Sequence, residues 1–267
     1  ALALAVYPFN NVSLPAERRA DDLLSRLTFS ERVGMAYMNA TMAYGNDTVK
    51  GKAGDLPSTN VSRLGVPMFN WMGQGSVYRG AANGCNLNCC SGYKCTSIDG
   101  YATQFPQGTG WASTWNTRLV FRVGQAIGDE SRAINAHYPN KTVDYRTGAS
   151  SVINIVRDGR WGRTPETLGE CPQLTADVAT ALNRALMGFE EDQPFTDALP
   201  VKGSYRVLPT LRHFTAYAGP DSKRFGFNAV VSEADLRHTY LPAWETLVRR
   251  HAVGGVTNVN TCLVKLC

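Results

Sequence analysis

The stretch RDGRWGRTPETLGECP, residues 157–172, combines residue types that can recognise a polar ligand. Its charged side chains include three arginines spaced three apart and two glutamates that follow them: Arg157, Arg160, Arg163, Glu166 and Glu170. A guanidinium group is a planar, permanently charged donor, which suits binding to vicinal hydroxyls or carboxylates. The stretch follows the β-branched run 150–156, so we expect its polar side chains at the end of a buried strand.

Polar side chains also follow two other apolar runs. Gln74 comes after the run 65–72, and Arg212 and His213 come after the run 205–211. The carboxyl ends of parallel strands gather functional side chains at one face of a sheet. We therefore expect these residues to lie near the arginines of 157–172. The alternative is that they are solvated loop residues in salt bridges.

Strands and helices alternate along the chain, which predicts an α/β protein with a parallel sheet. Strands are expected over 65–72, 150–156, 205–211 and 252–258. Helices are expected over 116–135, 172–190 and 232–251, and two short ones over 14–38.

Several residues mark the expected helix ends. Thr28 with Glu31, and Ser232 with Asp235, have the spacing of capping boxes. Pro172 suits a first helical turn, and Pro242 should kink or split the last helix.

Composition excludes several classes of protein. The chain has 267 residues, 43% of them hydrophobic, which is enough for a sizeable core. Its net charge of +5 is dispersed without a basic run, so we expect no nucleic-acid partner. No apolar stretch is long enough to predict a membrane-spanning helix.

Several features indicate a secreted or cell-wall protein. Residues 1–5 hold an Ala-x-Ala pattern typical of a signal-peptide remnant, with an ordinary apolar start as the alternative. Five N-x-[ST] sequons are candidates for glycosylation, at Asn11, Asn39, Asn46, Asn60 and Asn140.

The cysteines support the same interpretation. Four of the seven lie in a loop at 84–96, and two lie at the end of the chain; the disulfide candidates are Cys85, Cys89, Cys90, Cys95, Cys262 and Cys267. Zinc binding is the alternative for the loop, but its C-x3-C-C-x4-C spacing is not a standard zinc pattern. We expect no metal and no cofactor.

Five stretches resemble, in order, the N-terminal domain of glycoside hydrolase family 3. INIVRDGRWGRTPETLGECPQLT is similar to the family pattern N-I-x-R-D-P-R-W-G-R-x-x-E-T-x-G-E-D-P. The others are GVPMFNWMGQG, TQFPQGTGWASTWNTRLVFRVGQAIGDESRA, LRHFTAYAG and FNAVVSEADLRHTYLPAWETLV. The likeness runs from about residue 7 to 250 and is greatest to the β-xylosidases and β-glucosidases.

The resemblance implies a TIM-type (β/α)8 barrel that binds the terminal non-reducing sugar in its mouth. Arg163 and His213 occupy positions that contact this sugar in the family. Arg212 stands where the family has Lys, and Gln74 where the xylosidase-like members have Glu. Arg157 and Arg160 are expected to be structural, pairing with carboxylates such as Glu166 and Glu170. Trp161 is expected to be a packed residue at the barrel rim.

No catalytic residue is assigned. In this family the nucleophilic Asp and the acid/base residue follow the region matched here, and the last acidic residue of this chain is Glu245, inside an expected helix. Retaining glycosidases need two carboxyl groups about 5 Å apart. Arginine pairing should lower the pKa values of Glu166 and Glu170, which makes them poor general acids.

The expected architecture is an incomplete barrel. Residues 6–267 should form a single domain with about the first half to two-thirds of the family's barrel, because roughly four strand–helix units are counted where eight close a barrel. An open edge should then be covered by a protein partner or by self-association, and the tail TCLVKLC could take part.

Three functions remain open. The first is part of a secreted glycosidase for terminal β-D-xylosyl or β-D-glucosyl residues, expected to be inactive as this chain alone. The second is a non-catalytic module that binds β-linked sugar weakly. The third is a structural subunit of an extracellular assembly.

Overall fold

The structure is a computed structural model that describes residues 7–36, 60–66, 103, 105–137, 147–196, 199–201, 203–219, 227–257 and 263–266. The chain divides into two compact units, an N-terminal unit of residues 1–72 and a C-terminal unit of residues 73–267. The single domain expected over 6–267 stays a prediction. The expected signal-peptide remnant at 1–5 lies outside the described residues.

The N-terminal unit contains the two short helices predicted there. Helix α1 spans Ala16–Arg26 and α2 spans Phe29–Ala36, with 3-10 turns at Pro8–Asn10 and Ser62–Leu64. The capping box is confirmed: Thr28 N donates to Glu31 Oε2 at 2.8 Å, and Glu31 N donates to Thr28 Oγ1 at 3.3 Å. A small apolar cluster holds the unit together, formed by Phe9, Leu27, Val61 and Leu64.

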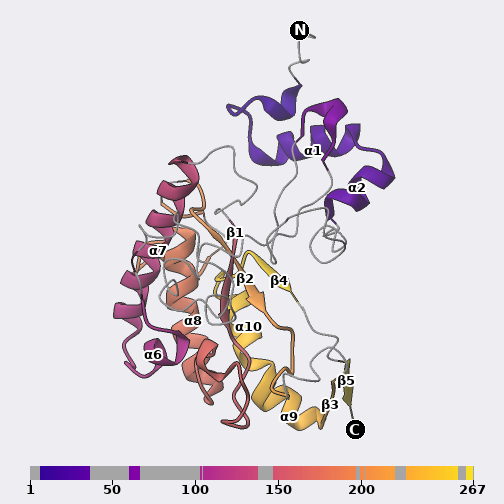
Figure 1. The fold of residues 1–267 in the computed structure, drawn as a ribbon. Helices are drawn as coiled ribbons and strands as arrows, with labels where there is room; N and C mark the ends of the chain where they lie inside the picture. The colour runs from indigo at the N-terminus through magenta and orange to yellow at the C-terminus, as the bar shows by residue number, and fades with distance from the viewer. Residues whose placement is uncertain are drawn as a thin grey trace. The chain divides into compact units, whose positions relative to one another are not determined.

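The C-terminal unit contains a three-stranded parallel sheet in the order β1–β2–β4 (Figure 1). Strand β1 is Thr147–Val152, β2 is Leu208–Arg212 and β4 is Gly255–Thr257. Three predicted strands and their parallel arrangement are thus confirmed. The predicted strand 65–72 lies almost wholly outside the described residues.

The first of these strands begins and ends earlier than its β-branched run predicts. The run covers 150–156, whereas β1 ends at Val152. Beyond that point the chain pairs with a distant segment: Val152 bridges to Thr167, and Val156 N donates to Gly169 O at 3.1 Å. The apolar run 150–156 therefore reflects burial on both sides of the chain and does not indicate where the strand ends.

In the described part of the C-terminal unit, two helices precede β1, and a third lies between β1 and β2. Helix α6 is Gly108–Ala112, α7 is Thr117–His137 and α8 is Pro172–Met187. Pro172 stands in the first turn of α8, as predicted, and Cys171 Sγ accepts the amide hydrogen of Leu174 at 3.5 Å as the cap. Gly188, at φ 94°, ends α8 in a conformation that costs glycine little.

The last predicted helix is divided. Ser232 caps α9 (Glu233–Asp235), a π-helical turn η6 follows at Leu236–Tyr240, and α10 runs over Pro242–Arg249. Proline has no amide hydrogen to donate to the preceding turn, so the predicted break at Pro242 is confirmed. A further strand pair, β3 (Asn228–Val231) with β5 (Leu263–Leu266), is parallel and places part of the C-terminal tail beside β3.

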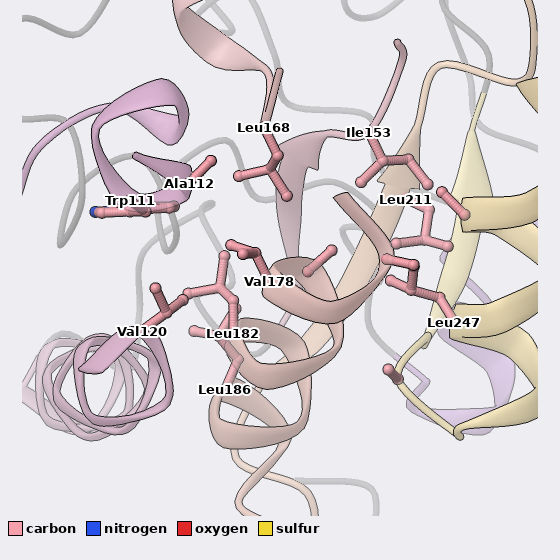
Figure 2. Packing of buried hydrophobic residues seen from close by; sticks show 14 of the residues in the cluster. Trp111, Ala112, Val120, Ile153, Leu168, Val178, Leu182, Leu186, Leu211 and Leu247 are labelled. Atoms are coloured by element: carbon pink, nitrogen blue, oxygen red, sulfur yellow. The ribbon is translucent and has the colours of Figure 1, made fainter. Parts of the chain in front are cut away.

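Helix α8 forms the centre of the main core (Figure 2). It contacts both β1 and β2 and packs against α7 and α10. Leu182 and Leu186 of α8 and Leu211 of β2 are fully buried in this core, and each contributes about 1.5–3 kcal/mol when it is removed from water. No helix in the described part of the chain is long and apolar enough to cross a membrane.

Candidate functional site

The carboxyl ends of β1 and β2 lie side by side, and the segments that leave them carry the predicted polar residues. Ile153 N donates to Arg212 O at 3.0 Å, which holds the two segments together just past the strands. A third segment, the 3-10 turn at Thr164–Glu166, comes from the arginine-rich stretch. The expected gathering of Arg163, Arg212 and His213 at this end of the sheet is therefore present.

Arg163 is the centre of the group. Its Nε and Nη2 donate to the two oxygens of Glu166 at 2.6 and 2.7 Å, so the pair is bidentate. Its Nη1 lies 2.8 Å from His213 Nε2. Arg163 immediately precedes the 3-10 turn that contains Glu166, and this spacing of three residues brings the fork and the carboxylate together.

Glu166 also interacts with a second arginine. Arg212 Nη2 lies 3.6 Å from Glu166 Oε2, and both side chains are buried. We call Arg163, Glu166, Arg212 and His213 the arginine cluster. Two guanidinium groups share one buried carboxylate in it, which concentrates positive charge at the strand ends.

Burial and pairing act in opposite directions on these arginines. Burial lowers the pKa of Arg212 to about 9, so the group remains charged at neutral pH. Burial also acts to lower the pKa of Arg163, but the hydrogen bonds and charge of Glu166 raise it overall. Arg163 keeps its charge because its carboxylate partner compensates for lost water.

Two aromatic side chains, Trp161 and Tyr217, pack beside the arginine cluster. The ring of Tyr217 is edge-to-face with His213 at 5.6 Å and with Trp161 at 5.0 Å. Arg163 Cζ is 5.6 Å from the centroid of the same tyrosine ring. Trp161 is buried in a cluster with Val152, Val156 and Tyr217, which confirms the prediction of a packed tryptophan.

The backbone at Gly108 closely approaches the backbone at Glu166 and Thr167. A Cβ added at Gly108, the first residue of α6, would lie 2.6 Å from Thr167 O and 2.8 Å from Glu166 O. Only glycine allows the start of α6 to come this near. The position of the Glu166 backbone thus depends on a residue far from it in sequence.

The predicted partners of the outer arginines were partly wrong. Glu166 binds Arg163 and Arg212, while Arg160 pairs with Asp158 at 2.5 Å and Glu170 is exposed. Arg157 is exposed, with Cζ 5.9 Å from the Tyr240 ring. The periodic spacing of the arginines could not show which one turns inward, because that depends on the turn at 164–166.

Sequence reasoning also missed Asn154. This side chain is buried at the carboxyl end of β1 and hydrogen-bonds the backbone of His213 and Thr215. The available signal was a single amide side chain inside the apolar run SSVINIV, because a buried polar group needs hydrogen-bonding partners.

The remaining predicted site residues are exposed or lie outside the described residues. Asn11 and Asn60 are exposed, whereas Gln74, three sequon asparagines and all six disulfide candidates lie outside: Asn39, Asn46, Asn140, Cys85, Cys89, Cys90, Cys95, Cys262 and Cys267. Cys171 is exposed. Within the described ranges, no three His, Cys, Asp or Glu side chains group as a metal site requires.

The arrangement is suited to binding hydroxyl groups. A guanidinium group carries five N–H donors, and three of those of Arg163 bond Glu166 and His213, while a further interaction links Arg163 to the Tyr217 side chain. Arg163 also retains more exposed side-chain surface than Arg212 or Glu166. Planar, fixed donors of this kind are what directional recognition of a sugar needs.

Comparison with known proteins identifies the family. Residues 86–261, more than half of the chain, match the Glycosyl hydrolase family 3 N terminal domain. The chain belongs to glycoside hydrolase family 3. Over 94% of its length it is 31% identical to a protein of Arabidopsis thaliana described as probable beta-D-xylosidase 7.

Solved structures show the same fold. A GH3 exo-beta-xylosidase, XlnD, determined with a xylobiose aziridine probe, is similar over 98% of this chain, with a TM-score of 0.69 and 24% identity. Beta-glucosidase 3B from Thermotoga neapolitana, determined with glucose, is similar over 91%, with a TM-score of 0.67 and 23% identity. The chain spans 29% of the length of each of these relatives.

Proposed function

We propose that residues 1–267 form the sugar-binding part of a family 3 β-glycosidase site for terminal β-D-xylosyl or β-D-glucosyl residues. The observation that carries this proposal is the 2.8 Å contact between Arg163 Nη1 and His213 Nε2, which joins two family motifs from separate strand ends. The xylosidase and glucosidase relatives support the choice of sugar.

We further propose that these residues do not by themselves supply the catalytic carboxyl pair. A retaining glycosidase needs a nucleophile and a proton donor about 5 Å apart. Both oxygens of Glu166 accept hydrogen bonds from Arg163, which keeps this carboxylate engaged as an acceptor. Glu166 therefore serves to hold the arginines rather than to transfer protons.

Sugar binding is tested by thermal unfolding of the 267-residue chain with xylose and with glucose. A ligand at 100 times its Kd adds about 2.7 kcal/mol of stability by mass action. We expect a rise in Tm that disappears in Arg163→Ala and persists in Arg160→Ala, because Arg160 is exposed and paired elsewhere. No rise with either sugar in the wild-type chain would favour the structural-subunit alternative.

Hydrolysis is tested with aryl β-xyloside and β-glucoside. We expect turnover by this chain no greater than that of the His213→Ala variant. Turnover at an ordinary enzymatic rate would contradict the proposal that these residues do not by themselves supply the carboxyl pair.

We propose that the parallel sheet is part of a TIM-type barrel. Strands β1, β2 and β4 are neighbours in the sheet in the same order as in the sequence, with α8 between the first two and α10 before the third, as in a (β/α)8 barrel. Strand β3, between β2 and β4 in the sequence, pairs with β5 instead. A partial barrel has an open strand edge that a protein partner or a second copy would cover. Analytical ultracentrifugation across a concentration series tests this, and a strict monomer would contradict self-association.

We propose that the protein is extracellular and carries glycans at Asn11 and Asn60. Both side chains are exposed, and each bonds the serine of its own sequon: Ser13 Oγ donates to Asn11 Oδ1 at 2.7 Å, and Asn60 Nδ2 donates to Ser62 Oγ at 2.9 Å. Expression through a eukaryotic secretory pathway should give a mass that falls on deglycosylation and falls stepwise in Ser13→Ala and Ser62→Ala. An unchanged mass in both variants would contradict glycosylation at these positions.

A further inference from the structure

Asn154 connects the ends of β1 and β2 through its side chain. Its Nδ2 donates to His213 O and to Thr215 O, both at 2.8 Å, and its Oδ1 accepts the amide hydrogen of His213 at 2.8 Å. The residue is 1% exposed, so these bonds are formed away from water. A buried amide with this set of partners strongly constrains the backbone it contacts.

The three bonds determine how the Asn154 amide is oriented. Two carbonyl oxygens must face its NH2 group, and one amide hydrogen must face its oxygen. A flipped amide would place oxygen against oxygen, so this orientation follows from the network. Asn154 therefore hydrogen-bonds the N–H and the C=O of His213 and the C=O of Thr215.

The contact of His213 with Arg163 determines the protonation of the imidazole. A guanidinium group can only donate, so Nε2 of His213 must be the acceptor at 2.8 Å. The ring is then neutral and carries its proton on Nδ1. In this state the ring, together with Glu166, orients the guanidinium of Arg163.

We propose that Asn154 is a positioning residue for Arg163, acting through His213. It holds the backbone at 213–215 so that Nε2 of His213 accepts from Arg163 in the neutral Nδ1–H form. The value of this arrangement for sugar binding rests on the proposed function above. The positioning itself is tested separately, because the protonation of His213 can be observed without any sugar.

The first experiment is NMR of the 267-residue chain labelled with 15N-histidine at pH 7. The chain has four histidines, and His213→Gln assigns the signals of the one of interest. We expect the pattern of a neutral ring protonated on Nδ1. A ring protonated on Nε2, or on both nitrogens, would overturn the proposal whatever the sugar experiments show.

The second experiment compares two buried asparagines. Asn154→Asp keeps the acceptor for His213 N but turns two donors into lone pairs that face carbonyl oxygens. Asn183→Asp is the matched control, because Asn183 is also fully buried and donates to a backbone carbonyl, Ala252 O at 2.9 Å. We expect Asn154→Asp to lose the Nδ1–H pattern and to bind xylose at least about ten-fold more weakly, while the control retains both.

Asn154→Ser covers the case in which the aspartate variant does not fold, since it shortens the side chain without adding charge. An unchanged His213 pattern in a folded Asn154 variant would overturn the proposal. If the wild-type chain binds no sugar but its Nδ1–H pattern depends on Asn154, the positioning role is supported and the proposed sugar-binding function fails.

Discussion

Two arginines three residues apart in the same motif form similar ion pairs in opposite surroundings. Arg160 forks onto Asp158, with Nη2 and Oδ2 2.5 Å apart, and Arg163 forks onto Glu166 at 2.6 Å. The side chains of the first pair are 92% and 44% exposed, whereas those of the second are 15% and 4% exposed. The hydrogen-bond lengths are nearly the same, whereas the two pairs differ strongly in burial.

Burial changes what each pair does. Water competes with the exposed pair and screens it, so the pair adds little to stability and leaves its side chains free to move. The buried pair cannot exchange its partner for water, and removal of one member leaves a desolvated charge. A site that must hold donors in fixed directions for a ligand therefore needs the second kind of pair.

Removal of the carboxylate that Arg163 and Arg212 share should cause the largest loss of stability. Glu166→Ala leaves Arg163 and Arg212 without the carboxylate they share, and loss of one partner of a buried pair costs about 3–5 kcal/mol. Urea unfolding followed by circular dichroism measures the change. A loss no greater than that of Asp158→Ala would show that burial does not distinguish the two pairs.

Two glycines, Gly108 beside the buried pair and Gly159 beside the exposed pair, allow the same comparison at the backbone. Gly108→Ala would place a methyl group 2.6 Å from Thr167 O, beside the buried pair, and overpacking of this kind costs about 1–3 kcal/mol. Gly159 lies next to the exposed pair, and an added Cβ there meets nothing within 4 Å. Gly159→Ala should therefore change the free energy of unfolding by no more than about 0.5 kcal/mol. Equal losses in the two variants would contradict the close approach at Gly108.

Salt should weaken the contribution of the exposed pair to stability more than that of the buried pair, and this difference should be smaller than the preceding effects. Asp158→Ala should change the unfolding midpoint relative to the wild-type chain less in 1 M NaCl than at low salt, because the Debye length falls to about 3 Å and salt weakens the attraction between exposed charges. The effect of Glu166→Ala should persist at the same salt concentration, since buried pairs are screened much less. Thermal unfolding of both variants at low and high salt measures this.

The smallest expected effect is the acid dependence of the exposed pair. Hydrogen bonds from Arg160 lower the pKa of Asp158 from 3.8 to about 2. The stability that Asp158 contributes is therefore fully present above pH 3.8 and is lost as the pH falls toward 2. NMR titration of the Asp158 carboxyl should show the lowered pKa in the wild-type chain and a higher pKa in Arg160→Ala, where only the backbone N–H of residue 160 still donates to this carboxyl. The same pKa in both would show that the side-chain pair does not form in solution.

Much of the secondary structure could be predicted because its signals are local. Thr28 and Glu31 are three residues apart and form a capping box by themselves, and Pro172 and Pro242 act on the turn in which they stand. The end of β1 could not be predicted in this way. It depends on Thr167 and Gly169, which approach only when the chain has folded back.

The candidate site divides along the same line. The sequence alone identified the motif, the family and the presence of Arg163, Arg212 and His213, because these depend on residue type and order. Only the tertiary structure decided that Arg163 is buried against Glu166 while Arg160 faces water, and that Asn154 holds His213 from 59 positions away. Burial and long-range hydrogen bonds arise from how distant segments pack, and no local pattern of residues encodes them.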